Sequence, residues 1–225
     1  MRKTSFFDPV DRLNSDFKPD FQVSGRREYE RILEPPMESY EISRFILNNF
    51  VGWEEMSQAS EKVMTRKYSG RWISQQCSES EIIPKKFQLL LYHTLLPEVY
   101  FISRIFILHL TMKETFPLDD KIIEIIKPMY PGMWPAEFGY FKDRTGLRWK
   151  DLAEESERLF SKRYGESTFS KLRSSNAYTI PFKFQALLYR FMLDSDYYQC
   201  RREFWETTEL GYLPDISDGV DVKYV

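Results

Sequence analysis

Two stretches of the chain, IPKKFQLLLY at residues 83–92 and IPFKFQALLY at residues 180–189, have nearly the same sequence. Eight of the ten positions are identical; the differences are Lys85 against Phe182 and Leu89 against Ala186. Such self-similarity at one separation marks an internal repeat, and it decides how the rest of a chain is interpreted. We therefore interpret the chain as two copies of one module.

The repeat continues on both sides of this stretch. Upstream, WEEMSQASEKVMTRKY at residues 53–68 matches WKDLAEESERLFSKRY at residues 149–164, with a separation of 96 instead of 97. Downstream, the residues that align are Tyr100, Arg104 and Phe106 with Tyr198, Arg202 and Phe204. We predict a first module at residues 27–117 and a second at 118–208. An extended N-terminal arm, residues 1–26, and an acidic C-terminal tail, residues 209–225, flank them.

Each copy has helical periodicity. In the second copy, large apolar residues recur at Trp149, Leu152, Leu159 and Phe160, which gives one apolar stripe and a charged opposite face. No stretch alternates with period two for long enough to predict a strand. The pattern predicts an all-α fold of two tandem, duplicated small helical bundles, with about four or five helices in each.

Composition argues against catalysis. His93 and His109 are the only histidines, and the counterpart of His93 in the second copy is Arg190. The sequence contains no Gly-rich phosphate loop, no nucleophile elbow and no HExxH motif. Cys77 and Cys200 do not occupy equivalent positions, which favours neither a disulfide framework nor a zinc site. We expect no enzyme activity, no cofactor, no metal and no small-molecule substrate.

No apolar run reaches the roughly 20 residues that a membrane-spanning helix needs. The longest, residues 99–110, is interrupted by Arg104. We expect no membrane association, and a protein of the nucleus or cytosol.

The second copy resembles the MADF domain, a three-helix Myb/SANT-like module. The segments that carry the resemblance are IIEIIKPMYPGMW, GYFKDRTGLRWKDLAEESERLF and FSKLRSS, from residue 122 to residue 175. Matched to the family pattern, Trp149, Leu152 and Ala153 are the core of the second helix. Phe169 stands where a tryptophan is usual, and Leu172-Arg173 complete the third helix.

The first copy resembles the family less closely. It keeps Trp53 and Met56, and Trp72 is taken as the counterpart of Phe169, with Gln75-Gln76 in place of Leu172-Arg173. The apolar FQALLYRFM helix gives a second, weaker resemblance to the nematode SPK domain, which is also helical. The resemblance to the MADF domain implies a chromatin-associated, nuclear binding protein.

In Myb-related folds the third helix lies in a DNA groove, where basic side chains contact phosphates. Residues 158–173 and residues 62–71 each have a local charge of +4, although the whole chain carries −2. The predicted DNA contacts are Arg158, Lys162, Arg163, Lys171 and Arg173 in the second copy and Arg66, Lys67 and Arg71 in the first. A solvated helix face would show the same charges.

Two functions stay open at this point. The first is a non-enzymatic chromatin protein that contacts double-stranded DNA through these basic helix faces. The alternative is a protein–protein interaction adaptor in a nuclear complex with no direct DNA contact, which the acidic total charge favours. In that case the arm and the tail would add contacts to partner proteins.

Overall fold

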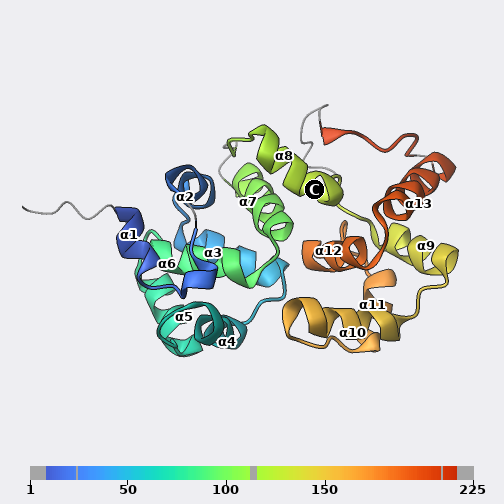
Figure 1. Ribbon diagram of the computed structural model, residues 1–225. Coiled ribbons are helices and arrows are strands. Elements are labelled where there is room, and N and C mark those ends of the chain that lie inside the picture. Colours follow the sequence, from blue (N-terminus) through green and yellow to red (C-terminus); the bar gives the residue numbers. More distant parts are fainter. Residues whose placement is uncertain (1–8, 24, 112–115, 209, 217–225) are drawn as a thin grey trace, which may run out of the picture. The chain divides into compact units, whose positions relative to one another are not determined.

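The computed structural model describes residues 9–23, 25–111, 116–208 and 210–216 (Figure 1). Over these residues the fold consists of thirteen α-helices and two short 3-10 helices, without a strand. The extended pairings here are two isolated bridges, Phe17 with Met64 and Glu38 with Ile82. The predicted all-α class is confirmed.

The chain divides into two compact units, residues 1–95 and residues 96–225. The first unit contains α1 (Pro9–Asn14), η1 (Pro19–Phe21), α2 (Arg26–Leu33), α3 (Ser39–Asn48), α4 (Trp53–Val63), α5 (Gly70–Glu79) and α6 (Lys85–Thr94). The second contains α7 (Pro97–Thr111), α8 (Asp120–Ile126), η2 (Lys127–Met129), α9 (Pro135–Thr145), α10 (Trp149–Phe160), α11 (Glu166–Arg173), α12 (Phe182–Phe191) and α13 (Asp194–Thr207).

The helices repeat in the same order. The starts of α3, α4 and α5 lie 96 residues before those of α9, α10 and α11, and α2 spans the positions that match α8 and η2. The starts of α6 and α7 lie 97 residues before those of α12 and α13. The additional residue therefore falls in the loop between α11 and α12, and it leaves the register of every helix unchanged.

A buried serine makes the same bonds in both units. The Ser60 hydroxyl donates to the Ser57 carbonyl at 2.7 Å and accepts from the Tyr68 amide at 2.9 Å. Ser156 donates to Ala153 at 2.7 Å and accepts from the Tyr164 amide at 3.0 Å. The hydroxyl thus gives the turn after α4 or α10 the acceptor that the helix no longer supplies.

A second shared device anchors α6 and α12. The Ile83 amide donates to the Met37 carbonyl at 2.8 Å, and the Ile180 amide donates to the Met133 carbonyl at 2.9 Å. The next helix then begins just after a proline, Pro84 or Pro181. Proline is preorganised for a helix start and has no N–H to leave unpaired there.

A buried glutamine joins α6 to α2 in the first unit and α12 to η2 in the second. Gln88 donates through Nε2 to the Ile32 carbonyl at 2.8 Å, and Gln185 donates to the Pro128 carbonyl at 3.2 Å. Because Ile32 and Pro128 are 96 positions apart, the two units satisfy the same buried backbone group with the same side chain.

Helix starts carry the expected caps. The Asp119 side chain accepts from the Ile122 amide at 2.9 Å and so caps the start of α8. Glu41 and Glu137 lie at the third position of α3 and α9, and each carboxylate accepts from the amide that precedes its helix. Both glutamates are fully buried.

Packing corrects two alignments made from the sequence. Tyr197 and Arg201 are the fully buried pair of α13, whereas Tyr198 is partly exposed and Arg202 is exposed. The counterparts of Tyr100 and Arg104 are therefore Tyr197 and Arg201, one residue earlier than predicted.

The second correction concerns α5. Ile73 is fully buried like Phe169, and each is the fourth residue of its helix. Trp72, taken as the counterpart of Phe169, is partly exposed and corresponds to Thr168 instead.

Helix α7 belongs to the second unit by its packing. It contacts α8, η2 and α12, and the Phe106 ring lies 6.1 Å from the Phe182 ring. The sequence repeat instead places α7 in the first module, as the counterpart of α13. Sequence similarity and packing thus divide the chain at different points, and the predicted limits at 117/118 and 208/209 stay predictions.

The described part of the N-terminal arm lies on the first unit and is not extended throughout, since it includes α1 and η1. Phe17 is buried, and the Lys18 amide donates to the Val63 carbonyl at 2.8 Å. Residues 1–8 of the arm, and Asp218 and Asp221 of the acidic tail, lie outside the described residues. Across the described helices, none combines the length and apolar character that crossing a bilayer requires.

Candidate nucleic-acid interface

The third helix of each triad packs on both preceding helices. Helix α11 contacts α9 and α10, and α5 contacts α3 and α4. In α11 the buried side chains are Phe169 and Leu172, and the remaining residues, apart from the partly buried Thr168, are exposed. A helix held by one narrow apolar face leaves its other side available to a ligand.

The basic residues at the end of α10 already have partners. Arg158 donates from Nε to Glu155 at 2.8 Å, and Nη1 of Arg163 lies 3.7 Å from a Glu157 carboxylate oxygen. The ammonium of Lys162 lies 5.1 Å from the centre of the Tyr164 ring. Water weakens ion pairs whose arginine is exposed, so a phosphate could replace either carboxylate at small cost.

The two basic residues of α11 differ in their surroundings. Nη2 of Arg173 lies 2.8 Å from Asp143 of α9, and its side chain crosses Gly139, where an added Cβ would be 3.1 Å from Nε. Arg173 thus braces α11 against α9. Lys171 is exposed and, among the described residues, forms no ion pair.

In the first unit, Lys67 pairs with Glu61 at 2.7 Å. Hydrogen bonding to Lys67 lowers the pKa of Glu61, and the pKa of Lys67 rises for the same reason. The Arg66 guanidinium lies 5.7 Å from the centre of the Tyr68 ring. Arg71 is exposed, and within the described part of the chain it has no ion-pair partner.

These pairs change the charge balance that the sequence suggested. Glu155, Glu157 and Asp143 all lie outside residues 158–173 and, when they are included, reduce the +4 of that window to +1. Glu61 reduces the first window from +4 to +3. The window in the first unit therefore keeps more positive charge than the window in the second unit.

Trp149 packs against the core of the second unit. The Trp149 ring stacks on Phe138 at 5.4 Å and 13°, and it lies 6.3 Å from the Phe169 ring. Both Trp53 and Trp149 are partly buried. As predicted, Trp149 is a packing residue. The backbone of Trp53 lies close to that of Gly70, where an added Cβ would be 2.7 Å from the Trp53 carbonyl oxygen.

Sequence reasoning missed a lysine that both units place against aromatic rings. Lys183 is 2% exposed, its ammonium lies 4.5 Å from the centre of the Tyr164 ring, and it donates to the Tyr164 hydroxyl. Its counterpart, Lys86, is partly exposed and lies 5.0 Å from the centre of the Tyr68 ring. The signal in the sequence was the shared KFQ triplet of the opening stretch.

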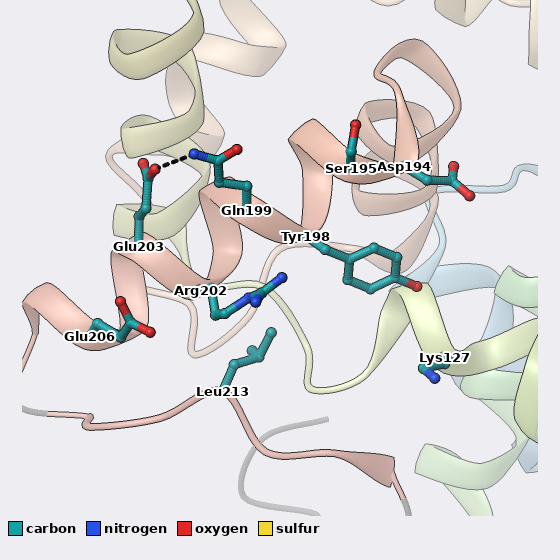
Figure 2. A pocket seen from close by; sticks show the side chains of 9 residues that line it. All are labelled: Lys127, Asp194, Ser195, Tyr198, Gln199, Arg202, Glu203, Glu206 and Leu213. Atoms are coloured by element: carbon teal, nitrogen blue, oxygen red, sulfur yellow. Dashed lines mark hydrogen bonds between the residues drawn. The ribbon is translucent and has the colours of Figure 1, made fainter.

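The second unit also has an open cavity of about 830 Å³ along α13 (Figure 2). Its lining residues are Asp194, Ser195, Tyr198, Gln199, Arg202, Glu203 and Glu206 of α13, with Lys127 from η2 and Leu213 from the segment after α13. Glu203 accepts from Gln199 at 2.8 Å and from Arg144 at 3.0 Å. Charges of both signs therefore face this cavity.

Groups suited to metal binding do not gather in the described residues. No three His, Cys, Asp or Glu side chains of this part of the chain lie close enough together to hold a metal ion. Cys77 and Cys200 are buried, free thiols, and burial raises the pKa of Cys77 to about 12, far from a reactive thiolate.

Comparison with models of protein families, with curated proteins and with solved structures gives no match for this chain. The interpretation of its function therefore depends on the geometry above.

Proposed function

We propose that this chain is a non-enzymatic, chromatin-associated protein that contacts double-stranded DNA through tandem Myb/SANT-like modules. The observation that carries the proposal is the repeated triad, α3–α4–α5 and α9–α10–α11, in which the last helix packs on the first two. That helix is the element which enters the major groove in helix-turn-helix proteins. A nuclear location follows from this function.

In the second unit the proposed contacts are Lys171 and the basic residues at the end of α10. Lys171 is the best single candidate, because it is exposed and would lose no ion pair on meeting a phosphate. Arg158, Arg163 and Arg173 would each exchange a carboxylate for a phosphate, which weakens the net gain. Arg66, Lys67 and Arg71 add contacts from the first unit.

The test is anisotropy of a fluorescent 20-base-pair duplex over a range of salt concentrations. Lys171→Glu should weaken binding and reduce the slope of log affinity against log salt by about one or more. Lys150→Glu is the matched control, because it makes the same charge change at the other end of α10, where Lys150 pairs with Glu154 at 3.8 Å. Equal slopes for both variants, or no duplex binding at low salt, would contradict the proposal.

A second candidate function is a protein-binding adaptor without DNA contact. Two observations favour it: three of the five predicted contacts in the second unit are ion-paired, and the cavity along α13 presents both signs of charge. A cavity of this kind suits a peptide with mixed charges better than a phosphate backbone. If the chain is such an adaptor, a partner protein recovered in a pull-down should still be recovered after nuclease treatment, and it should be lost from pull-downs with the Arg202→Glu variant.

A further inference from the structure

The most distinctive surface of the first unit is a pair of stacked rings. Tyr68, in the turn after α4, and Trp72, in the first turn of α5, have ring centres 4.8 Å apart and planes inclined by 15°. Both rings are partly exposed, and both also contact the edge or face of buried Phe87, at 6.0 and 5.5 Å. The stacked rings therefore contact the core through Phe87 and are partly exposed to solvent.

The core does not require a tryptophan at position 72. Ile73 is the buried residue of that helical turn, and the second unit folds the same turn with Thr168 in place of Trp72. Ser69 caps α5 through the Trp72 amide, at 3.3 Å, and that bond is independent of the indole. Trp72 contacts Phe87 but remains partly exposed, and a large, rigid aromatic side chain at such a position is typical of a recognition surface.

Cations surround the two rings. The Lys86 ammonium lies 5.0 Å from the centre of Tyr68 and 5.2 Å from that of Trp72, and Arg66 lies 5.7 Å from that of Tyr68. Arg71 is exposed and precedes Trp72 directly. These positive charges would repel a cationic ligand, and they attract one that combines a flat ring with a negative charge.

We infer that Tyr68 and Trp72 form a stacking platform for an unpaired base of single-stranded nucleic acid, with Arg66 and Arg71 as phosphate contacts. Aromatic platforms in positive surroundings bind DNA and RNA strands by this chemistry, largely without regard to sequence. In a duplex the stacked neighbouring base pairs cover the faces of each base, so the site selects single strands. It is separate from the duplex contact proposed for α11, and it shares Arg66 and Arg71 with the duplex contacts proposed for the first unit.

The experiment titrates the full chain with fluorescein-labelled dT10 and, separately, U10, and follows anisotropy. Trp72→Thr introduces the residue that the second unit uses at this position, so the fold should persist. We expect it to weaken binding of both strands roughly 5- to 150-fold, the range for loss of one stacked base. If only one of the two strands binds, the 2′ position of the sugar or the C5-methyl group of thymine is also read.

Leu47→Thr is the control, because it also replaces an exposed apolar side chain of the first unit, at the end of α3. It should leave binding unchanged. Arg71→Glu should weaken binding and lower its salt dependence, and this variant alters no buried contact.

Single strands that fail to bind, or that bind Trp72→Thr as tightly as the parent chain, would overturn the platform. The two proposals fail separately. Lys171→Glu should affect the duplex and leave dT10 binding nearly unchanged, whereas Trp72→Thr should do the reverse.

Discussion

A fully buried arginine sits at the centre of the second unit. Arg201 donates from Nε to Glu137 at 2.7 Å, and both side chains are completely inaccessible. Its remaining donors reach the carbonyls of Pro131 at 2.7 Å and Tyr130 at 3.2 Å. One guanidinium thus satisfies a carboxylate and the irregular segment before α9, which is a role that a lysine could not fill.

Because removal of one member leaves the other charge buried and unpaired, we expect Arg201→Met to reduce the free energy of unfolding by about 3 to 5 kcal/mol. Arg202→Met is the matched control, because Arg202 is next to Arg201 in the sequence and its side chain is exposed. Its effect should stay within about 0.5 kcal/mol. Urea denaturation followed by circular dichroism measures both. Similar losses in the two variants would show that the ion pair is not the source.

His93 is the residue through which pH should act on the first unit. Its ring lies 5.3 Å from Phe17 and 5.4 Å from Tyr92, and its Nε2 is buried with no hydrogen-bond partner among the residues that the structure describes. Burial lowers the pKa of His93 to about 4, against a weaker opposing effect of Glu28.

The sign of the pH effect follows from that depressed pKa. The unfolded chain, whose histidine has a pKa near 6.5, binds the proton more readily than the folded chain between pH 6.5 and pH 4. Stability should therefore fall by about 1 to 3 kcal/mol as pH falls through this window. His93→Phe should remove that part of the dependence in urea melts at pH 7 and pH 4.5, and an unchanged difference would count against it.

The limits of prediction at this scale are visible in α13. Its sequence contains Tyr197-Tyr198 and Arg201-Arg202, so each buried residue has an identical neighbour, and an alignment has no chemical basis for choosing between them. Only packing makes the choice. In the same way, the pairing of Arg173 with Asp143 joins positions 30 residues apart, so a charge count over a short window could not include it.

At the scale of elements, the start of α5 depends on close backbone approach. A Cβ added to Gly70 would lie 2.7 Å from the Trp53 carbonyl oxygen and 2.8 Å from its carbon, both of them backbone atoms at the start of α4. The glycine therefore sets the distance between the beginnings of α4 and α5.

Gly70→Ala should destabilise the chain by about 1 to 3 kcal/mol, because the backbone of one helix must move. Gly165→Ala provides the comparison: it lies at the start of α11, and its added methyl group would meet nothing closer than the Ser167 hydroxyl at 3.6 Å. Because Gly165 is the N-cap residue of α11, where alanine is less favourable than glycine, that variant should cost less than about 1 kcal/mol. Thermal melts distinguish the two, and equal midpoints would refute the steric argument.

Most elements could be predicted from the sequence because their signals are local. The cap at Asp119, the prolines before α6 and α12 and the apolar stripe of α10 each mark a helix without reference to the rest of the chain. The register of α5 could not be predicted. Trp72 and Ile73 are adjacent and both apolar, and only Ile73 is fully buried.

At the scale of the whole molecule, α7 decides where the second unit begins. Besides the ring contact of Phe106 with Phe182, Glu98 of α7 accepts two bonds from Arg190 of α12, at 2.8 and 3.2 Å. The repeat pointed to another division, because nearly every side of α7 is apolar and its periodicity does not indicate which partner it covers.

A fragment of residues 96–225 should therefore melt at a higher temperature than one of residues 118–225. The shorter fragment leaves apolar surface of α8 and α12 exposed to water, which costs about 25 cal/mol per Å². Circular dichroism during heating measures the difference. Coincident melting curves would show that α7 adds nothing to this unit and would favour the division that the repeat suggests.

The additional residue before α12 has an evolutionary and practical meaning. The length difference is confined to the loop between α11 and α12. At the end of this loop and of its counterpart in the first unit, the amide of Ile180 or Ile83 donates to the equivalent carbonyl, that of Met133 or Met37. We therefore expect the two halves to be exchangeable. A chimaera that carries the stretch from α3 to α5 in place of that from α9 to α11 would inherit compatible attachment points. One ancestral gene segment could thus diversify its exposed surface twice over while a common scaffold stayed in place.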